Sequence, residues 1–131
     1  MIVLFINCKL FPFISWIMAG IKIYETRNRN TLKSIIGKQV YLAETGKHKK
    51  PLIKCIATIN EPIKIDNLKD YNRYRNQTMI EKNSVYDFTR ETKYKYLYRL
   101  SNVQKVKEFY LPGNAVYHGR IYATIDNIES R

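Results

Sequence analysis

The sequence predicts a small α+β domain, a mixed β-barrel of five or six short strands with one or two short helices. Its 131 residues are the usual length of a single domain, which we assign to residues 1–131. Hydrophobic residues make up 45% of the chain and aromatic residues 13%, which excludes a disordered chain and is enough for a packed core. Short runs of β-branched and aromatic residues, separated by Gly and Pro, follow one apolar N-terminal segment.

The apolar N-terminal segment is expected to form a strand and then a helix. Ile2–Ile6 is a continuous apolar run, which is typical of a buried strand. Pro12 suits a first helical turn and Gly20 suits a C-terminal cap, so we expect a helix from about Pro12 to Ala19. A targeting segment is the alternative, but a signal peptide carries its positive charge ahead of the apolar stretch, whereas Lys9 interrupts this one. We therefore expect no membrane association and a cytoplasmic location.

Five later runs alternate polar and apolar residues or are rich in β-branched residues, and they predict the remaining strands. These runs are Ile23–Arg27, Val40–Glu44, Leu52–Ile59, Lys93–Leu100 and Gly119–Ile125. In the third run, Ile53, Cys55, Ala57 and Ile59 share a face that we assign to the core. The stretch Asp66–Lys82 is dense in Asn, Arg and Tyr and predicts a short helix followed by a loop.

The charge balance points to an anionic partner. There are 23 Lys and Arg against 11 Asp and Glu, a net charge of +12, with a pI near 9.7. A positive net charge of this size is most typical of nucleic-acid binding. Binding to an anionic membrane or to an acidic protein is the competing explanation. Cys8 and Cys55 lack metal-ligand or disulfide-framework spacing and are expected to be reduced thiols. His48 and His118 have no ligand-spaced partners, so we expect no metal and no cofactor.

The segment Pro12–Arg27 contains the pattern GxKxxExR, formed by Gly20, Lys22, Glu25 and Arg27. Two later segments add to this pattern. They are Val40–Ile63 and Leu111–Tyr122, and the second contains the run Asn-Ala-x-x-His-Gly-Arg. Together they resemble the ASCH domain, the activating signal cointegrator homology group of the PUA-like superfamily. The resemblance extends from about Ile2 to about Ile125.

This resemblance implies a PUA-like mixed β-barrel with a cleft beside the first helix, with Lys22, Glu25 and Arg27 in or near that cleft. It also makes His118 and Arg120 candidate ligand-binding residues. Two cations and a carboxylate gathered in this way could hold a small polar ligand or a phosphate. The alternative is an internal ion pair, Glu25 with Arg27, that only closes one end of the barrel.

Some ASCH-like proteins resemble amidohydrolases that act on acetylated cytidine with a Thr, a Lys and a Glu. Lys22 matches the lysine, but Glu25 stands where the threonine would be, and Thr26 is one residue out of register. A carboxylate cannot replace an alcohol nucleophile activated by a base. Glu81 lies in roughly the region of the family glutamate. Other members look like ribonucleases or RNA binders; if this chain is an enzyme, Lys22 and Glu25 are its catalytic candidates.

Three basic segments are candidate nucleic-acid contacts: the loop Gly46–Lys50, the run Asp70–Arg75 and the run Lys93–Arg99. They combine cations that neutralise phosphates with aromatic rings that stack on bases, although such charge is often only a solvated surface. Tyr94, Tyr96 and Tyr98 are expected to face the core. The candidate contacts are Lys47, Lys49, Lys50, Tyr71, Arg73, Tyr74, Arg75, Lys93, Lys95 and Arg99. We expect a monomeric RNA-binding or nucleotide-binding domain; a small hydrolase acting on RNA or a modified nucleoside is the alternative.

Overall fold

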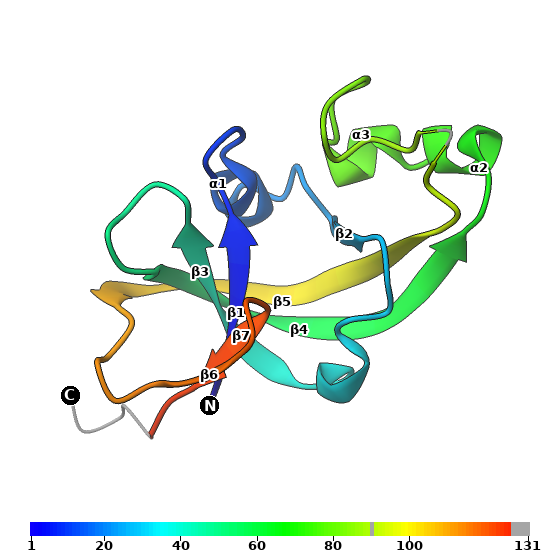
Figure 1. The fold of residues 1–131 in the computed structure, drawn as a ribbon. Coiled ribbons are helices and arrows are strands. Elements are labelled where there is room, and N and C mark those ends of the chain that lie inside the picture. The colour runs from blue at the N-terminus through cyan, green and yellow to red at the C-terminus, as the bar shows by residue number, and fades with distance from the viewer. Residues whose placement is uncertain (90, 127–131) are drawn as a thin grey trace.

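One mixed β-sheet organises the chain, as the computed structural model of residues 1–89 and 91–126 shows (Figure 1). In these residues the sheet has seven strands in the order β2-β5-β4-β3-β1-β7-β6. The strands are β1 (Ile2–Asn7), β2 (Tyr24–Arg27), β3 (Gln39–Thr45), β4 (Leu52–Ile65), β5 (Lys95–Tyr110), β6 (Val116–His118) and β7 (Tyr122–Thr124). Strands β1 and β3 are parallel and the other neighbours are antiparallel.

The predicted α+β class is confirmed, but the predicted barrel is not, because the sheet differs from it in two respects. It has seven strands where the sequence predicted five or six. In the described part of the chain, no backbone ladder joins the two edge strands, β2 and β6. A side-chain bond does link β2 to β1, because Arg27 donates to the carbonyl oxygen of Phe5.

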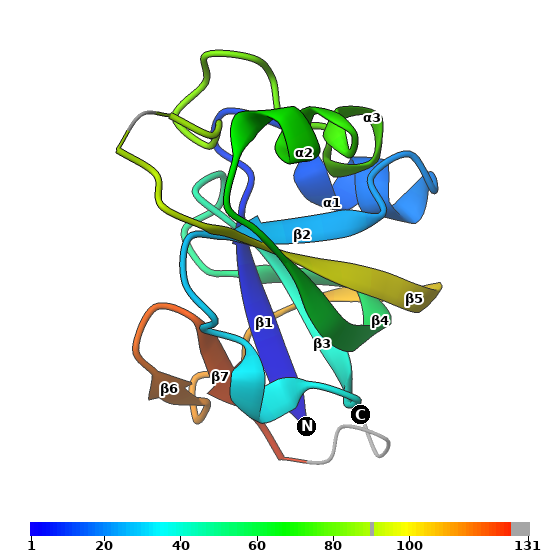
Figure 2. The same cartoon turned by 90° about the vertical axis from the view of Figure 1, so that its right-hand side faces the viewer.

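Three short helices gather at one end of the sheet, and the N-terminus and the β6–β7 hairpin lie toward the other end (Figures 1 and 2). They are α1 (Phe13–Met18), α2 (Leu68–Asn72) and α3 (Arg75–Thr78), and a single 3₁₀ turn covers Lys33–Ile35. Helix α1 is where the sequence predicted it, and Gly20 follows it with a positive φ of 75°. The single helix expected in Asp66–Lys82 is two helices.

Strands β4 and β5 are much longer than the sequence predicted, at 14 and 16 residues. Their ladder shifts register near Ile53, Ile56 and Ile59, and such bulges bend a strand without ending it. The sequence is polar around Pro62 and charged in the second half of β5, which is typical of strand ends. The alternation pattern therefore predicted strands that are too short. Strand β6 was also missed because it is short and fully exposed.

The larger core cluster packs α1 against the sheet, and a smaller one joins β1, β3, β4 and the segment around β7. The predicted face of β4, from Ile53 to Ile59, is fully buried, and so are Ile14 and Ile17 of α1. Cys8 and Cys55 are buried free thiols, and burial raises the pKa of Cys55 to about 12. Among the described residues, every helix is too short or too polar to cross a membrane.

Candidate functional site

A cleft of about 620 Å³ opens on one side of the sheet. Its walls come from the end of β1, the β2 strand, the loop between β3 and β4, the segment after α3, the start of β5 and the turn between β6 and β7. The loop, the segment after α3 and the β6–β7 turn lie on the same side in Figure 2. The charged residues that line the cleft are Glu25, Arg27, Lys95 and Arg120.

Glu25 and Arg27 form the central ion pair of the cleft. They share a face of β2, as the strand period of two predicted, and Arg27 Nη2 lies 2.9 Å from Glu25 Oε2. The same nitrogen donates to the Phe5 carbonyl oxygen at 3.1 Å, which ties β2 to β1. Within the described residues, Arg27 Nε is buried with no hydrogen-bond partner. The protein therefore holds both side chains in place, and Arg27 keeps one N–H donor without an acceptor.

Lys22 lies behind this pair and is not part of the cleft lining. Lys22 is 2% exposed, and its Nζ donates to the Thr78 carbonyl oxygen at 2.6 Å. Nζ is also 3.9 Å from Glu25 Oε1 and 4.7 Å from the centre of the Phe13 ring. Burial lowers the pKa of Lys22 to about 8, against the opposing effect of Glu25. This position lets Lys22 orient Glu25 without reaching the cleft.

Lys95 is in the cleft, which sequence reasoning missed. The alternation of Lys93–Arg99 predicted an outward-facing basic surface, and Lys93 and Arg99 are exposed as expected. Lys95 is only 4% exposed, because this face of the start of β5 forms part of the cleft wall. Its assignment to an outer basic surface is wrong. Burial lowers the pKa of Lys95, with opposing effects from Asp87 and Glu25.

The Asn-Ala-x-x-His-Gly-Arg run contributes Arg120 to the cleft, but not His118. His118 is exposed on β6, stacks on Tyr122 with ring centres 4.7 Å apart, and its Nε2 lies 3.2 Å from Thr124 Oγ1. These contacts hold the β6–β7 hairpin, so the placement of His118 in a ligand site is not supported. Across residues 1–89 and 91–126, no three His, Cys, Asp or Glu side chains are grouped as a metal ion would need.

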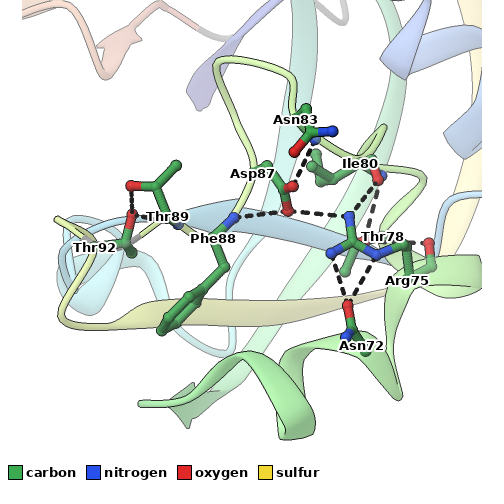
Figure 3. Close-up of polar contacts among 9 residues, drawn as sticks. All are labelled: Asn72, Arg75, Thr78, Ile80, Asn83, Asp87, Phe88, Thr89 and Thr92. Atoms are coloured by element: carbon green, nitrogen blue, oxygen red, sulfur yellow. Dashed lines mark hydrogen bonds and ion pairs between the residues drawn. The ribbon is translucent and has the colours of Figure 1, made fainter.

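The run Asp70–Arg75 is largely structural. Tyr71 is fully buried, so its ring cannot stack on a base, and that assignment is corrected. Arg75 donates to the Asp87 carboxylate at 3.0 Å and to Asn72 Oδ1 (Figure 3). Tyr74 is partly buried against Tyr24, with ring centres 5.5 Å apart. Arg73 alone keeps an exposed charge, near Asp70.

The loop between β3 and β4 borders the cleft. Gly46 has a φ of 84°, and a Cβ there would lie 2.7 Å from Asn7 Oδ1, so glycine lets the loop pack against the end of β1. His48 Nε2 bonds Glu44 Oε1 at 2.9 Å, which fixes the centre of the loop. The three lysines of the loop remain exposed: Lys47, Lys49 and Lys50.

Comparison with known proteins identifies the fold. No family model and no curated protein matches the chain. Among solved structures, an ASCH protein from Zymomonas mobilis aligns with a TM-score of 0.66 and 18% identity over 84% of this chain and 73% of that chain. The chain has the ASCH fold.

Two single-residue variants of the Zymomonas mobilis protein give the same result, both with a TM-score of 0.66. They are 17% and 18% identical, over 83% and 84% of this chain and 72% and 75% of theirs. The ASCH resemblance that three sequence segments predicted is thus confirmed for the fold. In this ASCH fold, the GxKxxExR pattern places Glu25 and Arg27 on the cleft wall and Lys22 directly behind them.

Proposed function

We propose that this domain binds RNA or a nucleotide in the cleft. The observation that carries the proposal is the lining itself: three cations, Arg27, Lys95 and Arg120, face one carboxylate, Glu25, in a chain with a net charge of +12. Small-ligand pockets usually measure about 300 to 1,000 Å³, so a cleft of this size accommodates a nucleotide. The excess of cations favours an anionic ligand.

Aromatic residues in the same cleft favour a ligand with bases. Phe5, Tyr86 and Tyr117 line it, and Phe5 packs against Tyr117 with ring centres 5.6 Å apart. Tyr117 is 57% exposed, so its ring is accessible for stacking. Unstacked bases bind aromatic faces in this way in single-stranded RNA complexes. The exposed lysines of the neighbouring β3–β4 loop would then contact the phosphate backbone.

A small hydrolase acting on RNA or a modified nucleoside is the second candidate function. It is favoured by Lys22, whose pKa of about 8 lies in the range of acid–base catalysts and which is 3.9 Å from Glu25. Because the Lys22 amino group is buried and bonded to Thr78, we assign it a positioning role, and Glu25 is the group that could touch a substrate. Turnover that Glu25→Gln abolishes would favour this candidate.

The test is binding of a fluorescently labelled single-stranded RNA at several salt concentrations. For single strands, the log–log slope of affinity against salt is about −0.7 per phosphate contact, so several contacts give a steep loss. Arg120→Gln should weaken binding, whereas Lys107→Gln, which removes an exposed charge outside the cleft, should not weaken it beyond the general loss of one charge. Affinity that is absent or independent of salt contradicts the proposal. Gel analysis of the same mixtures detects cleavage.

A further inference from the structure

The cations around the cleft differ in whether the protein itself supplies their acceptors. Arg27 bonds Glu25 and the Phe5 carbonyl oxygen, and Lys22 bonds the Thr78 carbonyl oxygen. Lys95 and Arg120 line the cleft but make no side-chain hydrogen bond or ion pair with any other residue of 1–89 and 91–126. Two cations of the lining are therefore available to a ligand.

Lys95 is the more enclosed of these two cations, since the residue is 4% exposed whereas Arg120 is exposed. The two carboxylates that act on it electrostatically are Asp87 and Glu25. Asp87 already accepts from Arg75 and from two backbone N–H groups, and Glu25 already accepts from Arg27. Within the described residues, Lys95 Nζ is not among the buried side-chain atoms that lack a partner, so the amino group still reaches the cleft. A ligand oxygen in the cleft can therefore accept from it.

We propose that Lys95 and Arg120 bind a terminal phosphomonoester, either of a free nucleotide or of the end of an RNA strand. This rests on the proposed function and names the group that the cleft takes. A phosphomonoester carries a charge of about −1.5 to −2 at neutral pH, which two free cations match. Lys95 is an enclosed lining residue of a cleft the size of one small ligand, so a group that ends there fits better than an internal phosphodiester with chain on both sides.

The test compares RNA hexamers of one sequence that carry a 5′-phosphate, a 3′-phosphate or only hydroxyl ends. A nucleoside monophosphate and inorganic phosphate are titrated in parallel, which separates a strand end from a free nucleotide. We expect one of the two phosphorylated hexamers to bind the unmodified domain about tenfold tighter than the hexamer with hydroxyl ends. One charge-assisted hydrogen bond provides an affinity gain of about this size. Equal, measurable affinity for all three hexamers overturns the proposal, as does the absence of binding to both the hexamers and the monophosphate, while salt-dependent binding of the hydroxyl form would still support the proposed function.

The variants decide whether Lys95 and Arg120 carry the effect. Lys95→Met keeps an unbranched side chain and should abolish the preference for the phosphorylated end, and Arg120→Gln should reduce it. Lys107→Gln should keep it in full. Because Arg120 is exposed, Arg120→Gln tests the proposal even where Lys95→Met does not fold. A preference retained in both variants overturns the subsite. Lys95-dependent binding of the free monophosphate without RNA binding supports the subsite and contradicts the RNA function.

Discussion

Two arginine–carboxylate pairs in this molecule differ in which of their polar groups the protein itself leaves without a partner. Arg75 and Asp87 form a closed network: Arg75 also donates to Asn72 and to the Ile80 carbonyl oxygen, and Asp87 also accepts from two backbone N–H groups (Figure 3). Burial alone would raise the pKa of Asp87, but these hydrogen bonds and Arg75 lower it. Arg27 and Glu25 have fewer partners, and both line the cleft.

The difference separates a pair that only builds the fold from a pair that also lines the cleft. Every strong donor of Arg75 is directed at the protein, so it fixes the segment after α3 that forms one wall of the cleft. The Arg27 guanidinium has a buried Nε without a partner among the described residues. Buried polar groups usually have partners, and an unpaired one calls for an explanation such as a bound water, an ion or a catalytic role. The predictions below test this contrast.

The largest expected effect is the loss of the closed pair. Asp87→Asn should lower the free energy of unfolding by about 3 kcal/mol, since removing one partner of a buried pair leaves the other charge uncompensated. Urea unfolding followed by circular dichroism measures it. Glu61→Gln, at an exposed position, is the control and should change little. A loss for Asp87→Asn no larger than that of the control would mean that the network is not structural.

The equivalent change in the Glu25–Arg27 pair should lower the free energy of unfolding less and the ligand affinity more. Glu25→Gln should lower the free energy of unfolding by about 1 kcal/mol, because Arg27 keeps its bond to the Phe5 carbonyl oxygen and faces the cleft. RNA or nucleotide affinity should change in the same variant and not in Glu61→Gln. If Glu25→Gln destabilised the fold as much as Asp87→Asn and left binding intact, the pair would be structural only.

Lys22 should give the fold a pH dependence in alkaline solution. Its pKa is about 8 in the folded state against an ordinary value of 10.5. Between these values the unfolded chain binds more protons, so raising the pH favours the folded state. The free energy of unfolding of the unmodified domain, minus that of Lys22→Met, should therefore rise from about pH 8 upward. Denaturant melts of both proteins from pH 7 to 9.5 measure it, and a constant difference would contradict the burial of a charged Lys22.

The smallest expected effect is at Tyr71. Tyr71→Phe keeps the buried ring and should leave RNA affinity unchanged, whereas a residue that stacks on a base costs about 1 to 3 kcal/mol when it is truncated. Tyr117→Ala, at an exposed ring of the cleft, is the matched comparison and should weaken binding. Weakened binding in Tyr71→Ala with an unchanged melting temperature would return Tyr71 to the binding surface.

The sequence predicted the parts of the fold that depend on local pattern. The apolar strand of β1, the helix between Pro12 and Gly20 and the buried face of β4 are all present. Strand alternation also put Glu25 and Arg27 on one face of β2. These features follow from neighbours along the chain, so the sequence is enough to find them.

The sequence could not predict which face of a strand a distant segment covers. Alternation separates Lys95 from Tyr96, but only the tertiary fold shows that the Lys95 side lines a cleft. Tyr71 and Arg75 sit in a run rich in charges and aromatics, and their surroundings depend on Asp87 and Phe88, which lie more than ten residues further along the chain. His118 was grouped with Arg120 because they are close in sequence, whereas the β6–β7 turn directs them differently.

The walls of the cleft come from separate stretches of the chain that lie between Phe5 and Arg120. Such a cavity exists only when both halves of the chain have folded together, so the ligand binds the native state and has no site in a partly folded one. By mass action, a ligand at about 100 times its dissociation constant then stabilises the native state by about 2.7 kcal/mol. Thermal unfolding is thus a direct sensor of occupancy. A panel of nucleotides can be ranked by melting temperature alone, without a label and without knowing the reaction.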